Sequence, residues 1–446
     1  MLIGGPEVMS SQSSRWIATA RLLRRAGFGA TGQQIDAVAN QDWSVYLDRV
    51  LGLDPDADPG ARATPRPMPI TPVIPAGDAG NAALQQFART LFAQMTELTS
   101  WWVRRMAAVH EPVHEKLTLL WHNHFATSAA KVAAAELMGQ QNQKLRTFKL
   151  GDFRILANAM LTDAAMLFWL DGVRNSAGAA NENLSREFME LFTLGHANGY
   201  TEQDVREGAR ALTGWSIGRG GVSALVAERY DRSSKTVMGM SGNLDEANFC
   251  DIVLSHPNSA RFVASKVWRM LASDSAPSAS TLDRLVSAYG KGRDLKALTK
   301  AVLLDPEFSG QAGTVVNTPI EWLIGVVRAL KAPIDDPQSL ESIVVALTVM
   351  GQRPFYPPNV GGWPRGQAWL STSSISARAW AAEKFTKSGD LSVVEEAALG
   401  DRIDAAGYLM GIGAWTDRSA AALKHLVNEP RQLVAAAVIT PEYLTS

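Results

Sequence analysis

Apolar residues recur at helical spacing along almost the whole chain, whereas the alternating pattern of half-buried strands is nearly absent. Trp16, Ala20 and Leu23 follow this spacing near the start, and the stretch 81–109 continues it as one long helix. The pattern predicts an all-α fold, a large multi-helix globular domain. At 446 residues the chain exceeds the size at which a single core usually stops growing. We therefore expect one large helical domain over residues 1–446, with a subdivision near residue 240 as the alternative.

Three stretches interrupt the helical pattern. Residues 54–77 contain seven prolines, which exclude regular helix. Residues 218–242 are rich in Gly and Ser, and residues 351–374 are rich in Pro, Gly and Trp. We expect long loops at all three places, with a short hairpin in the second.

Composition excludes several classes of protein. A formal net charge of −1 gives no reason to expect nucleic acid as a partner. No run of about 18 apolar residues occurs, so no membrane span is expected. The first residues lack the charged start and apolar core of a secretory signal, which predicts a cytoplasmic location for the chain as it stands, and a periplasmic one if a cleaved signal precedes it. The single cysteine, Cys250, lies in an apolar run typical of a buried position.

The first segment whose side chains could take part in catalysis or binding is Glu115–Phe125, which contains Trp121, His122, Asn123 and His124. On a helix Glu115 and His122 share one face, so they could form an acid–base pair. The two histidines point roughly 200° apart on a helix and can share a metal ion only if the helix ends at Trp121. The alternative is that hydrogen bonds inside a helical core satisfy both histidines.

The second segment, Asn181–Gly195, predicts an amphipathic helix over residues 183–195. Leu184, Phe188, Leu191 and Phe192 form its apolar face. On its polar side, Glu187 and Glu190 stand three residues apart, a spacing at which like charges repel unless something compensates them. A polar face of this kind fits a functional site and a structural network equally well.

The third segment runs from Tyr200 to Trp215. Thr201 and Asp204 have the spacing of a capping box, while Arg210 and Trp215 stand near a helix end, where they suit either ligand contact or packing. Two weaker features lie farther along the chain. Residues 256–266 make a helix start with Arg261 and Lys266, which could meet an anion, and the turn 358–364 carries Trp363, which could line a cleft.

These segments resemble a bacterial family known as domain of unknown function 1800, and the resemblance covers nearly the whole chain. It rests on the strings Leu22–Gly29, Trp121–Phe125, Asn181–Asn183, Arg186–Glu187, Glu190–Gly195 and Ala209–Trp215. One departure is Tyr230-Asp231, where many relatives have a His-Asp pair. The resemblance implies an exported-polymer or cell-envelope context, because relatives are often exported and often encoded beside a protein similar to sulfatases and phosphatases. Such a protein is therefore an expected partner.

Three hypotheses for function follow. The leading one is a glycan-active hydrolase or lyase that uses carboxylate acid–base chemistry on a polysaccharide or oligosaccharide, without a cofactor. Its expected catalytic residues are Glu187, Glu190, Glu115 and Asp204. Its expected substrate-binding residues are Trp121, His122, Asn123, His124, Asn181, Asn183, Arg186, Arg210, Trp215 and Trp363. The second hypothesis is a metal-dependent enzyme that uses His122 or His124 with Glu187 and Glu190. The third is a non-catalytic scaffold or partner-binding protein whose polar clusters are structural networks.

Overall fold

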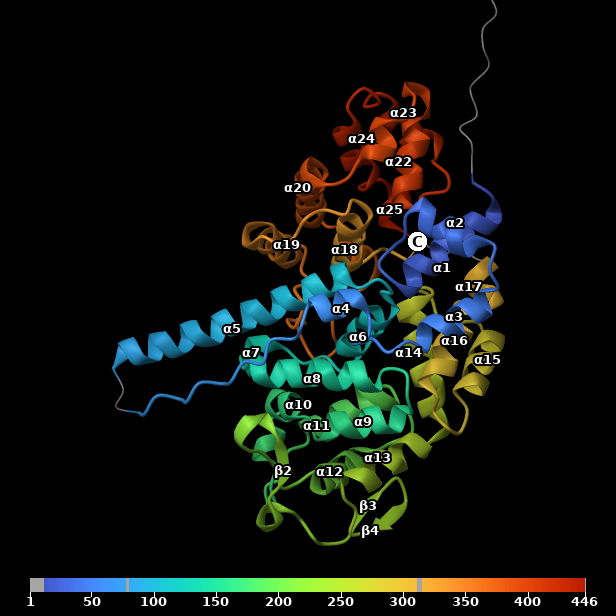
Figure 1. Ribbon diagram of the computed structural model, residues 1–446. Helices are drawn as coiled ribbons and strands as arrows, with labels where there is room; N and C mark the ends of the chain where they lie inside the picture. The colour runs from blue at the N-terminus through green and yellow to red at the C-terminus, as the bar shows by residue number, and fades with distance from the viewer. Residues whose placement is uncertain (1–11, 78–79, 311–314, 446) are drawn as a thin grey trace, which may run out of the picture.

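The structure, a computed structural model that describes residues 12–77, 80–310 and 315–445, is built almost entirely from helices (Figure 1). Helices account for 63% of the chain and strands for 4%, which confirms the prediction of an all-α fold. Strands β1 (Trp215–Ile217) and β2 (Ser223–Leu225) form one antiparallel hairpin. Strands β3 (Lys235–Val237) and β4 (Met240–Gly242) form another. The second hairpin lies within residues 218–242, for which the sequence predicts a loop with one hairpin, whereas the first hairpin begins before that region, at Trp215.

The helices follow in chain order. The N-terminal part contains α1 (Ser14–Ala26), α2 (Gly32–Ala39), α3 (Trp43–Leu51) and α4 (Pro59–Ala63). The central part contains α5 (Asn81–Ala108), α6 (Val113–His124), α7 (Ala129–Val132), α8 (Ala135–Phe148), α9 (Phe153–Leu161), α10 (Ala164–Trp169), η1 (Gly172–Arg174), α11 (Asn183–Glu187), η2 (Phe188–Thr193) and α12 (Glu202–Ala211). After the hairpins and the short turns η3 (Arg219–Gly221) and η4 (Ala227–Arg229) come α13 (Glu246–Ser255), α14 (Pro257–Leu271), α15 (Ala279–Tyr289), α16 (Leu295–Leu304) and α17 (Pro306–Gly310). The C-terminal part contains α18 (Pro319–Ala329), α19 (Pro337–Val349), η5 (Gly366–Leu370), α20 (Thr372–Ser388), α21 (Ser392–Glu395), η6 (Leu399–Asp401), α22 (Arg402–Met410), α23 (Asp417–Lys424), α24 (Pro430–Ala437) and α25 (Pro441–Leu444).

The prediction for the segment after Glu182 needs correction. The helix expected over residues 183–195 is α-helical only to Glu187 and continues as the π-helix η2. The extra residue in the π turn moves Met189 into the core, while Leu191 is only partly buried. Helices α7 and α8 are separate because Ala133 adopts a left-handed conformation with φ of 55° that ends α7, and α8 begins at Ala135. The capping box of Thr201 and Asp204 is present as predicted at the start of α12.

Side chains pack into two hydrophobic cores that interleave along the sequence. One core runs from Phe28 and α5 through α18, α19, α20, α22 and α24. The other combines α1 and α3 with α9, α13, α14 and α16, so it joins residues from both sides of position 240. Helix α6 contributes to both cores, with Leu119 in the first and Leu117 and Leu120 in the second. The domain count stays a prediction, but the cores place α6 at the centre of the molecule.

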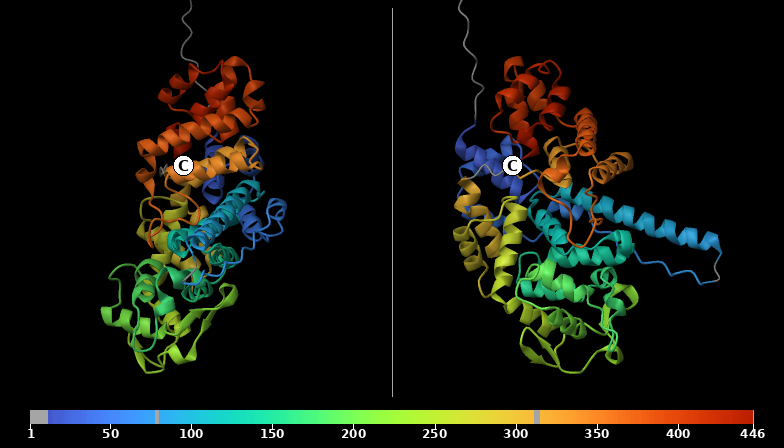
Figure 2. Two further views of the ribbon diagram at one scale, coloured as in Figure 1. Left: turned by 90° about the vertical axis from the view of Figure 1, so that its left-hand side faces the viewer. Right: turned by 180° about the vertical axis from the view of Figure 1, so that it is seen from behind.

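The first half of α5 projects from the body together with the extended part of the Pro-rich segment (Figures 1 and 2). The prediction that this segment contains no regular helix is wrong at Pro59–Ala63, where Asp58 caps the short helix α4 and the proline stands in its first turn. The segment then runs back along α5 and α8, where Glu136 accepts a hydrogen bond from the backbone of Thr71 at 3.0 Å. Across the described part of the chain, no helix is long and apolar enough to cross a membrane.

Candidate functional site

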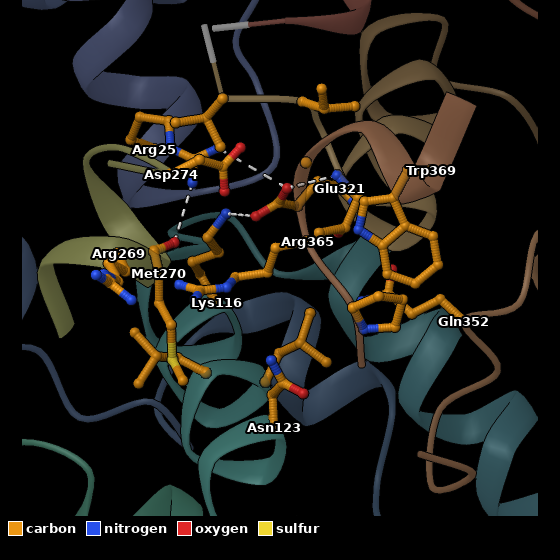
Figure 3. A pocket seen from close by; sticks show the side chains of 17 residues that line it. Arg25, Lys116, Asn123, Arg269, Met270, Asp274, Glu321, Gln352, Arg365 and Trp369 are labelled. Atoms are coloured by element: carbon orange, nitrogen blue, oxygen red, sulfur yellow. Dashed lines mark hydrogen bonds and ion pairs between the residues drawn. The ribbon is translucent and has the colours of Figure 1, made fainter. Parts of the chain in front are cut away.

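A pocket lies where α1, α6, α14 and α18 meet the irregular segment 351–374 (Figure 3). We call it the inner pocket. Its lining includes Arg25, Lys116, Asn123, Glu321, Arg269 and Arg365. The free volume is about 60 Å³. Because a single water needs roughly 10–15 Å³ of such volume, the inner pocket can hold one small polyatomic group.

A buried ion network forms the base of the inner pocket. Lys116 of α6 and Arg25 of α1 both pair with Glu321 of α18, the arginine at 3.8 Å. All three residues are buried. Burial alone would raise the pKa of Glu321, but the charges of Lys116 and Arg25 outweigh it and hold the pKa well below its ordinary value. The base therefore carries two cations against one carboxylate.

A second, larger pocket of about 470 Å³ continues along α14, and we call it the outer pocket. Arg269 and Arg365 line both pockets, and Lys266 lines the outer one. Burial, and then the neighbouring charges of Arg365 and Arg269, lower the pKa of Lys266 to about 8. The three cations thus repel one another across a shared concave surface. Together the two pockets form what we call the basic cleft.

None of the side chains of Lys266, Arg269 and Arg365 makes an ion pair or hydrogen bond with a described residue. The charge of Asp274 acts on Arg365, and Lys266 Nζ lies 5.7 Å from the ring centroid of Phe262. The Nε atom of Arg269 is buried from solvent and has no partner there. A buried donor without a partner costs free energy, so such groups need an explanation. A ligand with acceptor atoms would provide one.

The 351–374 segment is held against α6 by a specific contact. The side-chain oxygen of Asn123 accepts a hydrogen bond from the backbone of Trp363 at 2.7 Å. Gly362 has a φ of +87°, and a side chain there would lie only 2.4 Å from Asn123. Glycine is therefore required for this close approach, which brings Arg365 over the inner pocket.

Glu115 lies at the start of α6 in a separate buried network. Its carboxylate accepts hydrogen bonds from Trp102 at 2.9 Å, from Arg105 at 2.7 Å and from Arg146 at 2.8 Å. Burial alone would raise its pKa, but Arg146 and then Arg105 lower it to about 2. The structure thus gives this predicted catalytic residue a full set of structural partners and does not bring it to the other predicted carboxylates.

The two histidines are buried among aromatic rings. His122 lies 5.3 Å from Trp102 and 5.5 Å from Trp363, measured between ring centroids. His124 makes a hydrogen bond of 2.9 Å to the backbone oxygen of Phe192, and because a carbonyl only accepts, Nε2 carries the proton. Burial lowers the pKa of each histidine to about 3. Helix α6 continues to His124, so the extended backbone that a shared metal ion would need is not formed.

Neither imidazole is paired with Glu187 or Glu190. Within residues 12–77, 80–310 and 315–445, no group of three or more His, Cys, Asp or Glu side chains is arranged to hold a metal ion.

The remaining predicted polar residues gather around α11, η2 and α12. Glu187 is half-buried, and burial followed by the charge of Glu190 raises its pKa. Glu190 contacts the ring of His196 at 2.7 Å. The other members are engaged locally: Asn181 accepts a bond from the backbone of Asn183, Arg186 pairs with Glu182 and Glu202, Asp204 caps α12, and Arg210 pairs with Glu207 and Asp231.

The three tryptophans expected to stack on sugar rings lie in different places. Trp121 and Trp363 are 2% and 4% exposed, so their rings are covered by protein. Trp215 of β1 is half-buried. Packing therefore uses most of the ring surface that the stacking hypothesis requires.

Among the predicted site residues, only Asn123 lines the inner pocket, with Trp363 directly behind it. The sequence predicts that Lys266, in a basic helix start, could meet an anion, and this residue lines the outer pocket. Lys116, Glu321, Arg269 and Arg365 were missed. Each stands alone in its own segment, and only the packing of α6, α14, α18 and the 351–374 segment brings them together.

The chain belongs to the family described as "Protein of unknown function (DUF1800)", whose model matches residues 21–445. No curated protein and no solved structure matches the chain.

Proposed function

We propose that the protein binds an anionic ligand in the basic cleft. One observation carries the proposal: Lys266, Arg269 and Arg365 line one concave surface without an ion pair to any described residue. Mutual repulsion and partial desolvation make such an arrangement unfavourable in the absence of a ligand. Phosphate, sulfate or carboxylate oxygens would accept charge-assisted hydrogen bonds from two guanidinium groups at once.

The overall charge of the chain also supports anion binding in the basic cleft. With a net charge of −1, the protein has no general excess of basic residues that would place unpaired cations together by chance on its surface. The positive charge is instead local to one cleft. A local field of this kind attracts ligands of opposite charge.

The test is calorimetric titration of the full chain with sulfate and with phosphate at constant ionic strength. We expect saturable binding, weakened at least about tenfold by Arg269→Gln and by Arg365→Gln. Arg418→Gln is the matched control, because Arg418 is exposed on α23 and lines neither pocket. Absence of binding to the wild-type protein, or equal binding by all four proteins, would contradict the proposal.

The second proposal is carboxylate acid–base chemistry on a glycan at Glu187 and Glu190. A half-buried Glu187 with a raised pKa supports it, because a general acid must hold its proton near neutral pH. The pair lies on successive helical turns, so both groups would approach a ligand from the same side. Loss of turnover by about 100-fold on a glycan panel in both Glu187→Gln and Glu190→Gln is expected. Glu383→Gln, which removes an exposed carboxylate on α20, is the control.

The scaffold hypothesis is supported by Glu115, whose partners are all structural. It would be favoured if the protein bound no anion and turned over no glycan.

A further inference from the structure

The basic cleft is elongated, and its long direction follows one face of α14. Asn258, Phe262, Ser265 and Lys266 line the outer pocket, and Arg269 joins the outer pocket to the inner one. From position 258 to position 269 the rise of an α-helix gives a length of about 16 Å. This is longer than a single phosphate or sulfate ion needs. The cleft therefore suits a ligand with more than one contact point along the helix.

The two pockets differ in size and in lining. The inner pocket, at about 60 Å³, takes a group no larger than a carboxylate or sulfate. The outer pocket, at about 470 Å³, is within the range of pockets that hold small organic ligands. Arg269 and Arg365 stand between them. A ligand that fills both would place one anionic group inside and the rest of its length along α14.

The uncharged lining indicates what the rest of the ligand is. Asn198 and Asn258 border the outer pocket and are joined by a hydrogen bond of 2.7 Å. Phe262 adds an aromatic ring, and Ser265 adds a hydroxyl group. Amide and hydroxyl groups match sugar hydroxyls, and an aromatic ring matches the apolar face of a sugar. The asparagine pair is held by its own hydrogen bonds, and the Phe262 ring lies 5.7 Å from Lys266 Nζ, so ring and amide groups stand beside the cations. A bare polyphosphate chain would use the cations but would gain little from the ring of Phe262 or the hydroxyl of Ser265.

We infer that the ligand of the basic cleft is an acidic oligosaccharide, with one carboxylate or sulfate in the inner pocket and the adjoining sugar residues along α14 in the outer pocket. This inference rests on the proposed anion binding. Lys266 then meets the second anionic group of the chain. Arg261, at the far end of the outer pocket, contributes less because it already pairs with Asp283 at 2.9 Å.

The experiment is calorimetric titration of the full chain with galacturonate, tetragalacturonate, a heparin-derived tetrasaccharide, maltotetraose and tripolyphosphate. We expect at least one acidic tetrasaccharide to bind about tenfold or more tightly than galacturonate, and maltotetraose not to bind. The tighter of the two acidic tetrasaccharides identifies carboxylate or sulfate as the group recognised. Either result supports the inference.

Two variants localise the contacts. Lys266→Gln should weaken the bound acidic tetrasaccharide about tenfold and leave galacturonate, seated in the inner pocket, within about twofold. Lys291→Gln is the charge-matched control, because Lys291 is exposed after α15 and lines neither pocket. The inference is overturned if the acidic tetrasaccharides bind no more tightly than galacturonate, if tripolyphosphate binds more tightly than both, or if Lys266→Gln affects monomer and tetramer alike. If sulfate and phosphate also fail to bind, the proposed function itself fails.

Discussion

Glu115 and Lys116 are neighbours on α6, yet they face different regions. The charges of one region are paired within the protein, and the other region has an excess of positive charge. Glu115 enters a network in which a buried carboxylate is matched by two arginines and an indole N–H. Lys116 faces the inner pocket, where basic groups exceed acidic ones. The first region satisfies its charges within the protein. The second leaves the guanidinium groups of Arg269 and Arg365 without an ion pair to a described residue.

The comparison separates what holds this fold together from what it can recognise. A fully paired buried network is costly to break, because removing one partner leaves the other charges buried without a counter-charge in a low-dielectric environment. An unpaired cationic cluster contributes nothing favourable to the fold, because its members repel one another. Substitutions in the Glu115 network should therefore lower the free energy of unfolding strongly. Substitutions in the basic cleft should instead lower the affinity for anions.

The largest effect is expected from Glu115→Gln. The change leaves Arg105 and Arg146 without a buried counter-charge, so the free energy of unfolding should fall by about 3–5 kcal/mol. Urea denaturation measures it. Glu383→Gln removes an exposed pair with Lys387 on α20 and should cost less than about 0.5 kcal/mol. A loss for Glu115→Gln as small as that of the control would show that the network is not structural.

The stability of the wild-type protein should also depend on pH because of the Glu115 network. The pKa of Glu115 is about 2 in the folded state against an ordinary 4.5, so its contribution to stability is complete above pH 4.5 and is lost as the pH falls toward 2. The gap in unfolding free energy between wild type and Glu115→Gln should narrow by about 2 kcal/mol between pH 6 and pH 3. A gap that stays constant over this range would mean that Glu115 titrates normally.

Sequence patterns predicted the helical fold because apolar spacing reports directly on which face of each helix is buried. They predicted the cap at Thr201 for the same local reason. They did not predict the π turn at η2, which depends on packing that brings Met189 into the core.

The sequence did not predict the basic cleft for a related reason. Glu115 and His122 stood out because they are polar residues inside an apolar helix, and such residues are as often structural as functional. Arg269 and Arg365 are nearly 100 residues apart, and neither stands out in its own segment. Their shared position comes from the contact of Gly362 with Asn123, which no local pattern reports.

The double substitution Arg269→Gln, Arg365→Gln tests whether the basic cleft contributes to anion binding and not to the stability of the fold. Without ligand, the free energy of unfolding should change by no more than about 0.5 kcal/mol, because no intramolecular ion pair is lost. Sulfate at 100 times its Kd should stabilise the wild-type protein by about 2.7 kcal/mol more than the double variant. The comparison between the two proteins cancels the general stabilising effect of sulfate. Equal stabilisation of both would place any sulfate site elsewhere.

The smallest expected effect is a dependence of anion affinity on pH between 7 and 9. The pKa of Lys266 is about 8, so the side chain loses its charge as the pH rises through that value. Lys116, beside Glu321 at the base of the inner pocket, has a pKa near the same value, while Arg269 and Arg365 keep their charge.

The affinity for the acidic tetrasaccharide, which reaches both lysines, should therefore fall from pH 7 to pH 9, by roughly fivefold for each charge lost, which corresponds to about 1 kcal/mol. Titrations at pH 7, 8 and 9 measure it. In Lys266→Gln the fall should be shallower, because only Lys116 remains to titrate. An affinity that is constant or rises with pH would show that neither lysine contributes charge to the bound anion, and the recognition would then rest on the two arginines alone.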